Sequence, residues 1–300
     1  MKLAEDASGR TGTRTTNGEE PMHDREAELG PEREAFAPDE GGRVSVVIVE
    51  DHPQFREALT EAIEASRDLH LLQVCRDLPA GLEFVEHTRP DVLLVDLGLP
   101  SGSGMVLLKS APIWWGAKCT TAVLTMTGDE EHLLRSATAG AKGCLFKSDL
   151  PEEWVRAIRA LGSSQGTMHS KMAQHLLQPE NIQGDKGRNW DRGSQDVLLH
   201  IAAGYTVSET ANRMDCSEQE VGTRLRGIYD RLFQPGPNLS RRELQLLRLL
   251  NKGLTFKQCA DVMGVGESTT KTQSSRAYEK LGASNLQMAL YAAREAGLLY

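Results

Sequence analysis

The sequence predicts an α/β protein, with a doubly wound, five-stranded parallel sheet followed by an all-α region. Between residues 44 and 162, short apolar runs alternate with segments of helical periodicity. Such alternation favours parallel strands joined by crossover helices that cover both faces of a sheet. Residues 189–300 show helical periodicity throughout and contain no further strand-like run.

Each element of the first half follows from its local pattern. The run VSVVIV at 44–49 is β-branched at every position except Ser45, which suits a strand that is buried on both faces. Pro53 fits the first turn of the helix that follows. We expect strands at 44–49, 70–75, 91–96, 119–126 and 143–147. We expect helices at 53–66, 78–89, from about 105, at 129–139 and at 151–161.

Composition narrows the class of protein. Hydrophobic residues make up 39% and charged residues 25%, so most of the chain can form a core. No apolar run is long enough to cross a membrane, and the first ten residues lack the apolar region of a signal peptide. The five cysteines show no C-x-x-C spacing, which predicts buried thiols in a reducing, cytoplasmic compartment.

Charge and composition predict the domain boundaries. The net charge is -8, but residues 238–300 carry nine Lys and Arg against five Asp and Glu. Local sign decides attraction to phosphate, so an acidic chain can still bind nucleic acid. We expect five parts: a disordered acidic tail at 1–43, an α/β domain at 44–162, a linker with one short helix at 163–188, and helical modules at 189–237 and 238–300.

Polar side chains follow four of the five predicted strands. Glu50 and Asp51 follow the first strand, the third strand ends in Asp96, the fourth ends near Thr125 and the fifth ends in Lys147. Function in such sheets lies beyond the carboxyl ends of the strands, so these side chains should converge. Clustered carboxylates repel one another unless a cation lies among them, and oxygen ligands suit Mg²⁺. Asp96 ends the most apolar strand and is the candidate nucleophile toward phosphorus, with Thr125 and Lys147 beside the transferred oxygens.

Residues 44–162 resemble the receiver domain of two-component response regulators. The resemblance rests on Glu50-Asp51, Asp96 in VDLGLP, Thr125 in VLTM and Lys147 in LFKS. It implies the strand order 2-1-3-4-5 and transfer of a phosphoryl group from a histidine kinase to Asp96. It also implies a Mg²⁺ site made of the three carboxylates and the Gly98 carbonyl. Many receivers carry an aromatic switch residue three positions before the lysine, where this sequence has Cys144.

The helical half contains an internal repeat. Residues 194–232 align with 243–281 at an offset of 49, with nine identities over 39 pairs. In the second copy, Ser240 with Glu243 and Thr255 with Gln258 form capping boxes before two helices. A third helix then runs from the GVGE turn to about residue 281. Two helices joined by a tight glycine-containing turn are typical of helix-turn-helix DNA-binding modules.

Residues 239–284 resemble the DNA-binding domain of LuxR/NarL-type regulators, and 286–296 lies where that family has its dimerisation helix. A receiver followed by this domain is the NarL/FixJ architecture. The resemblance places Lys271, Thr272 and Ser275 where the family contacts bases. Arg276 is expected on the same outward face of the third helix.

The first copy resembles the same family but is degenerate. Gly222 stands where the second copy has Lys271, and residues 189–237 carry five basic against seven acidic side chains. Arg224 and Arg226 are its candidate phosphate contacts. Whether this copy contacts DNA or has a packing or partner-docking role stays open at this stage.

The sequence thus predicts a cytoplasmic regulator whose phosphorylation controls binding to double-stranded promoter DNA, acting as a homodimer when active. Its predicted partners are a sensor histidine kinase and DNA. No membrane is expected among its partners. The rival hypothesis is an adaptor or antagonist whose helical repeats bind another regulator. We expect no enzymatic activity beyond its own phosphoryl chemistry, because no second catalytic set is found.

Overall fold

The first domain is built on the predicted parallel sheet. The computed structural model describes residues 42–126, 130–178 and 190–300. Its five strands are parallel and lie in the order β2-β1-β3-β4-β5, which confirms the predicted fold class and strand order. The strands are β1 (Val44–Val49), β2 (Leu69–Cys75), β3 (Val92–Asp96), β4 (Thr120–Thr125) and β5 (Cys144–Phe146). The helices between and after them are α1 (Pro53–Glu64), α2 (Leu78–His87), α3 (Met105–Trp115), α4 (Glu130–Ala139) and α5 (Pro151–Gly162).

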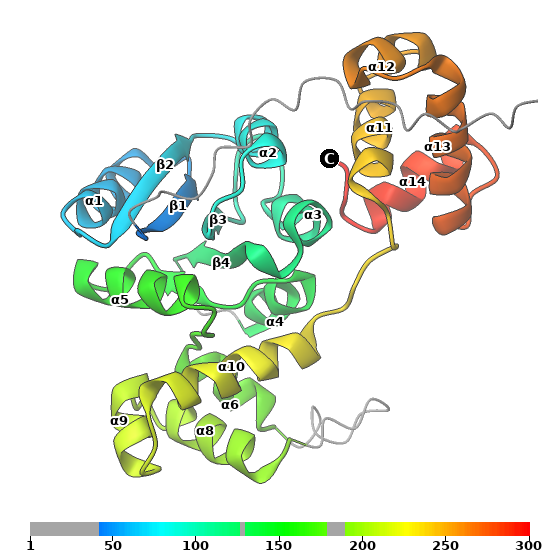
Figure 1. The fold of residues 1–300 in the computed structure, drawn as a ribbon. Helices are drawn as coiled ribbons and strands as arrows, with labels where there is room; N and C mark the ends of the chain where they lie inside the picture. Colours follow the sequence, from blue (N-terminus) through cyan, green and yellow to red (C-terminus); the bar gives the residue numbers. More distant parts are fainter. Residues whose placement is uncertain (1–41, 127–129, 179–189) are drawn as a thin grey trace, which may run out of the picture. The chain divides into compact units, whose positions relative to one another are not determined.

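Helices cover both faces of this sheet (Figure 1). Val46 and Ile48 of β1 lie in an apolar cluster with side chains of α1 and α5. Val47 and Val49 lie in a second cluster with side chains of α2 and α3. All four valine and isoleucine side chains are fully buried. Burial on both faces explains why five of the six residues of this strand are apolar rather than every second one.

A first helical module follows the α/β domain. It consists of α6 (Ser170–Leu176), α8 (Arg192–Ala202), α9 (Val207–Arg213) and α10 (Glu218–Leu232). Capping boxes begin α9 and α10. Met172 and Leu176 of α6 are buried in the same cluster as Leu198 and Leu225. The short helix expected in a linker therefore belongs to the core of this module.

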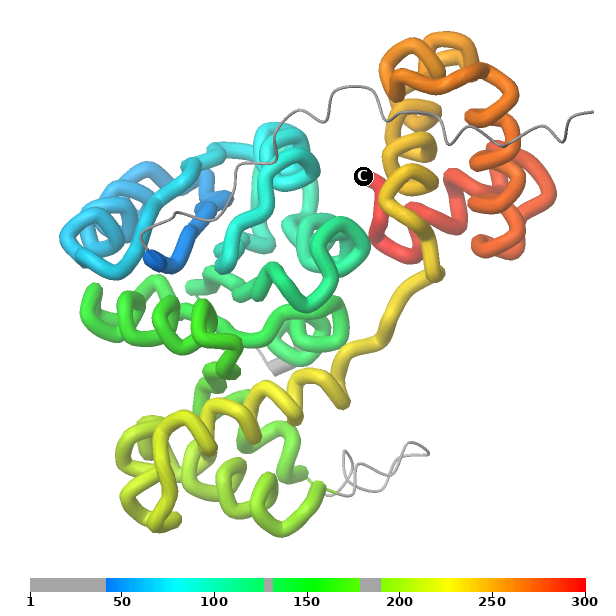
Figure 2. The backbone as a smooth tube through the Cα atoms, viewed as in Figure 1, coloured from blue at the N-terminus to red at the C-terminus, as the bar shows by residue number. Residues whose placement is uncertain are grey.

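A second helical module ends the chain. Its helices are α11 (Arg241–Asn251), α12 (Phe256–Met263), α13 (Glu267–Lys280) and α14 (Leu286–Glu295). The capping boxes predicted before α11 and α12 are both formed. Gly264, which ends α12, has a φ of 65°, a left-handed conformation that favours glycine. A segment without helix or strand, residues 233–240, joins α10 to α11 (Figure 2).

Two sequence predictions concern properties of the whole chain. Within the described ranges, no helix is both long and apolar enough to cross a membrane. The five cysteines are free thiols, and three of them are buried. The tail predicted to be disordered, residues 1–43, lies outside the described residues except for its last two positions.

Candidate functional site: an acidic pocket and an exposed helix

Three carboxylates lie together at the carboxyl end of the sheet. Glu50 and Asp51 directly follow β1, and Asp96 is the last residue of the neighbouring strand β3. One oxygen atom from each carboxylate can be chosen so that all three lie within 4.8 Å of one another. Glu50 is fully buried, whereas Asp51 and Asp96 are partly exposed. These three residues are called the acidic pocket below.

Lys147 bridges two carboxylates of the acidic pocket. Its Nζ atom lies 2.8 Å from Asp96 Oδ2 and 2.7 Å from Glu50 Oε2. The ring of Phe55, on α1, lies below the ammonium group, with 5.2 Å between Nζ and the ring centroid. The lysine directly follows β5, and its backbone N–H donates to the Thr125 carbonyl (2.8 Å). The sheet therefore brings the predicted lysine to the predicted aspartate.

Burial and charge shift the pKa values of the buried members of this group. Burial raises the pKa of Glu50 above its usual value, and the nearby Asp96 charge adds to this rise. The hydrogen bonds from Lys147 and from the His52 backbone oppose it. Burial lowers the pKa of Lys147, but hydrogen bonds to Asp96 and Glu50 outweigh burial, so its pKa is raised. The ammonium group is therefore held in its charged form between two carboxylates.

Arg56 holds the backbone that carries the acidic pair. Its Nη1 group donates to the carbonyls of Asp51 (2.9 Å) and Glu50 (3.3 Å). The His52 backbone N–H donates to Glu50 Oε1 (2.9 Å). Sequence reasoning missed Arg56, because nothing in the pattern distinguishes it from other charged residues of α1.

The loop after β3 holds Asp96 through backbone contacts. The Gly98 N–H donates to Asp96 Oδ1 (3.1 Å), so the loop turns back over the carboxylate. Gly104 donates from its N–H to the Leu97 carbonyl (3.2 Å). A Cβ atom on Gly104 would overlap the Asp96 carbonyl oxygen and the Val95 side chain. Only glycine fits at this position without moving the strand end that carries Asp96.

We therefore expect Gly104→Ala to lower the free energy of unfolding by roughly 2 kcal/mol or more, because backbone must move to relieve the overlap. Chemical denaturation measures this change. The matched control is Gly227→Ala, at a helical position where an added Cβ atom meets nothing within 4 Å. The control should be neutral or stabilising, by up to about 1 kcal/mol. Equal behaviour of the two variants would contradict the close approach.

Thr125 ends β4, and Cys144 begins the neighbouring strand β5. Thr125 is the last residue of β4, and its side chain is half-buried. Cys144, three residues before Lys147, packs against the cluster that contains Tyr229 of α10. Burial raises the pKa of its thiol to about 12, so this cysteine is not a reactive thiolate.

The DNA-contacting residues predicted in the second module lie on α13. Lys271, Thr272, Ser275 and Arg276 are all exposed on this helix. Lys271 forms an ion pair with Glu267 one turn away (2.7 Å). On the opposite side of the helix, the smaller side chains at 270, 274 and 277 are buried. The predicted outward face is thus free of contacts with the core of the module.

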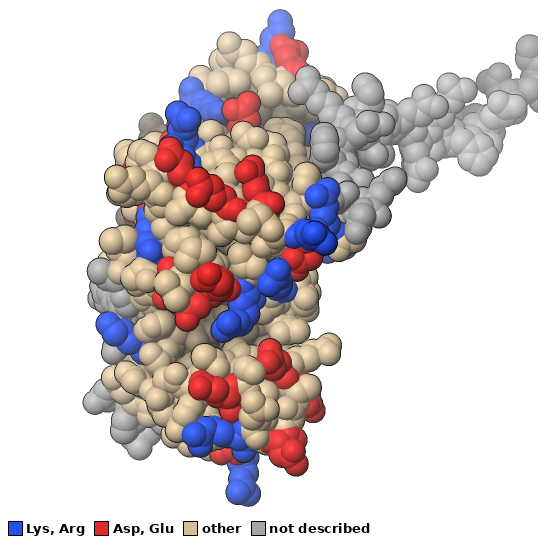
Figure 3. All heavy atoms as spheres, turned by 90° about the vertical axis from the view of Figure 1, so that its left-hand side faces the viewer, with Lys and Arg blue, Asp and Glu red and all other residues tan. Residues whose placement is uncertain are grey.

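The two arginines predicted in the first module are placed differently. Arg224 is exposed and lies 3.5 Å from Asp191. Arg226 is half-buried, and its Nη1 group lies 3.4 Å from Thr120 Oγ1 of β4. On the face drawn in Figure 3, acidic and basic side chains are intermixed. The four residues of α13 are thus more exposed than Arg226 is.

Comparison with known proteins gives two family matches. Residues 46–159 match the response regulator receiver domain, and residues 237–293 match the bacterial regulatory proteins of the luxR family. The second match covers the second helical module.

Individual similar proteins are regulators as well. The oxygen regulatory protein NreC of Staphylococcus carnosus is 27% identical over 222 residues, which is 71% of this chain and 100% of NreC. The DNA-binding transcriptional activator DevR/DosR of Mycobacterium tuberculosis is 26% identical over 243 residues, 80% of this chain and 88% of that protein. A solved LuxR-family two-component response regulator from Aurantimonas sp. SI85-9A1 is 28% identical, with a TM-score of 0.42, and the match covers 45% of this chain and 95% of that one. The chain belongs to the response regulators of the NarL/FixJ family, which join a receiver domain to a LuxR-type DNA-binding domain.

Proposed function

We propose that this protein is a transcription regulator in which a phosphoryl group on Asp96, received from a sensor histidine kinase, controls binding of the second module to promoter DNA. The observation that supports this most directly is the convergence of Asp96 and Lys147, whose charged groups are 2.8 Å apart beside two further carboxylates. In the transfer, an Asp96 carboxylate oxygen forms a bond to phosphorus, and the bond from phosphorus to the donor breaks.

The acidic pocket fits a magnesium ion. Its three carboxylates supply hard oxygen ligands, and Lys147 balances only part of their charge. Glu50, Asp51, Asp96 and the Gly98 carbonyl would hold the ion. When bound, it supplies positive charge that stabilises the developing charge of the phosphoryl oxygens. Lys147 and the Thr125 hydroxyl would contact those oxygens.

DNA binding is assigned to the outer face of α13. Lys271 and Arg276 supply positive charge for phosphates or guanine edges, and Thr272 and Ser275 supply hydroxyl groups. All four are exposed, which supports the assignment. In this proposal the protein binds promoter DNA in the cytoplasm.

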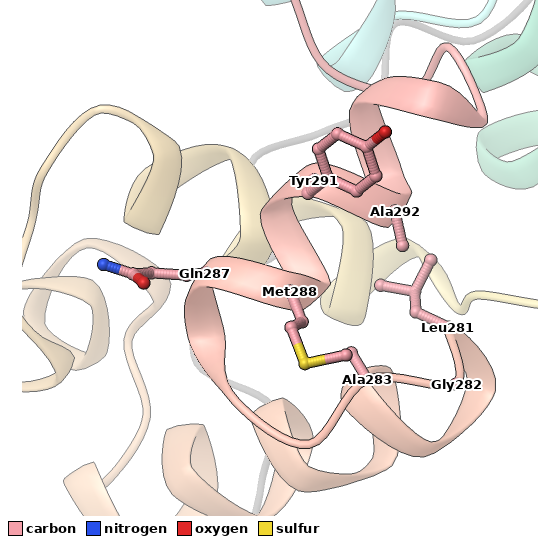
Figure 4. A pocket seen from close by; sticks show the side chains of 7 residues that line it. All are labelled: Leu281, Gly282, Ala283, Gln287, Met288, Tyr291 and Ala292. Atoms are coloured by element: carbon pink, nitrogen blue, oxygen red, sulfur yellow. The ribbon is translucent and has the colours of Figure 1, made fainter.

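We also propose that the active form is a homodimer that pairs through α14. Two large apolar side chains of this helix, Met288 and Tyr291, are exposed to 48% and 65%. They line a shallow pocket together with Leu281 and Ala292 (Figure 4). Burying such side chains against a second copy would stabilise association.

Binding to selected DNA tests the proposal. Duplexes enriched from a random pool on the full-length protein, with acetyl phosphate and MgCl₂ present, would be titrated by fluorescence anisotropy. We expect the affinity to fall with salt, because each neutralised phosphate contributes a slope of about −0.9 in a plot of log K against log salt. We also expect acetyl phosphate to raise the affinity.

Two outcomes would contradict the proposal. If acetyl phosphate changes the affinity of the wild type and of Asp96→Asn equally, the switch is not at Asp96. Absence of any salt dependence would favour the rival function, an adaptor whose helical repeats bind another regulator.

A further inference from the structure

Helix α10 of the first module carries two packed stripes. One stripe faces the module's own core and consists of Val221, Leu225, Ile228 and Leu232, all fully buried. The other stripe begins at Gly222, continues with one residue per turn through Arg226 and Asp230, and is extended by Phe233 just after the helix. The contacts of this second stripe lead to the receiver domain and the segment that follows it.

One of these contacts joins the backbone of α10 to the backbone of the chain just after α5. The Gly166 N–H donates to the Gly222 carbonyl (2.9 Å). A Cβ atom on Gly222 would lie 2.7 Å from Gln165 Oε1 and 2.8 Å from Gln165 Cβ. A Cβ atom on Gly166 would lie 2.5 Å from the Arg226 backbone nitrogen. The two backbones approach this closely because both positions are glycine.

Contacts continue along α10 and the residues after it. The Asp230 carboxylate lies 2.8 Å from Lys142 Nζ. The same ammonium group lies 5.2 Å from the centroid of the Phe233 ring. The Gln234 N–H donates to the Thr138 carbonyl at the end of α4 (2.9 Å). Together with the Arg226–Thr120 contact, these bonds hold the whole length of the stripe.

Apolar side chains complete the contact. Leu133 and Ala137 of α4 and Phe146 of β5 belong to the same buried cluster as Leu225 and Tyr229 of α10. Phe146 directly precedes Lys147, so the contact includes the strand that carries this lysine. The receiver and the first module therefore share one core.

The internal repeat shows which face of the first module is covered. At the offset of 49, Gly222 corresponds to Lys271 and Arg226 to Ser275. Both residues of the second copy are exposed on the face assigned to DNA, whereas Gly222 is buried and Arg226 is half-buried. The loss of lysine at 222, which looks like a defect in the sequence, is what permits the backbone contact with Gly166.

We propose that the first helical module is a receiver-docking domain, in which the face that reads DNA in the second copy binds the receiver of the same chain. The first module then leaves DNA recognition to the second. The assignment of this face to DNA in the second copy rests on the proposed function, whereas the contacts between the first module and the receiver do not.

Hydrogen exchange of the full-length chain tests the docking. Gly222→Lys restores the residue of the second copy and improves helix propensity, so α10 itself should stay helical. We expect exchange of the Gly166 and Gln234 amides to become about tenfold faster or more, because the bonds across the contact open. The control Thr223→Lys adds the same charge at the exposed neighbouring position and should leave both amides protected. Equal protection in the two variants would overturn the docking.

A charge swap gives a second measurement that does not disturb backbone packing. Asp230→Lys and Lys142→Asp should each increase exchange at Gln234, and the double variant should restore protection. The pair lies at the edge of the contact, so the effect is expected to be about two- to fivefold. A double variant no better protected than the single ones would contradict the assigned contact.

DNA titration separates docking from the proposed function. Arg226→Ala should change the affinity for the selected duplexes less than about twofold, whereas Lys271→Ala should weaken it clearly. If Arg226→Ala weakens binding as much as Lys271→Ala, the first copy reads DNA and the docking role is wrong. If neither variant weakens binding, the DNA assignment fails, and the exchange data still decide the docking.

Discussion

Asp96→Asn is expected to abolish phosphorylation of the full-length protein by acetyl phosphate. The amide cannot serve as the nucleophile, so phosphoryl incorporation should fall by about 1000-fold or more. Phosphate-affinity gel electrophoresis measures the incorporation. Because Asp96 Oδ2 lies 2.8 Å from Lys147 Nζ, we expect Lys147→Met to reduce the incorporation as well.

The control for this experiment is Glu57→Gln, which neutralises an exposed carboxylate on α1. It should be phosphorylated like the wild type, because Glu57 takes no part in the acidic pocket. Phosphorylation of Asp96→Asn at the wild-type level would show that another residue accepts the group.

Lys271→Ala is expected to give the largest loss of DNA affinity among single substitutions in the helical half. A lost contact to a base edge costs about 1–3 kcal/mol, which corresponds to about 5- to 150-fold in Kd. Arg276→Ala should act in the same direction, with a shallower salt dependence where the lost contact is to phosphate. Anisotropy titrations of the full-length protein at several salt concentrations measure both quantities.

Lys252→Ala provides the matched control, since Lys252 is an exposed lysine of the same module that lies outside α13. Its affinity should stay within about twofold of the wild type. An equal loss in Lys252→Ala and Lys271→Ala would mean that overall charge, and not the face of α13, determines binding.

The sheet and the acidic pocket could be predicted because their causes are local. A strand buried on both faces must be apolar, so a polar residue directly after it marks the strand end. Parallel strands then place Glu50, Asp96 and Lys147 at one edge, whatever the lengths of the helices between them. The capping boxes of α11 and α12 were also predictable, because each is contained within four residues.

Contacts between distant segments could not be predicted in this way. Arg56 acts through the geometry of two carbonyl groups, which leaves no trace in residue type or spacing. Gly104 is required only because the loop passes over the Asp96 carbonyl. The role of Gly222 depends on Gly166, which is 56 positions away and belongs to a different segment. The sequence pattern showed correctly that Gly222 stands in place of a lysine, but it did not show the reason.

The segment between the two modules is short, and this limits how far the DNA-binding domain can travel. Eight residues separate α10 from α11, and a fully extended chain of that length reaches at most about 28 Å. While α10 is held on the receiver, these eight residues limit the travel of the second module whenever its own contacts with the receiver, such as Arg248–Glu86 (3.5 Å), open. If α10 detaches from the receiver, the connection between the receiver and the second module includes every residue after α5. The effective concentration of one domain near the other then falls. Gly222, which permits the docking of α10, thus limits the volume that the second module can reach, although it lies outside that module.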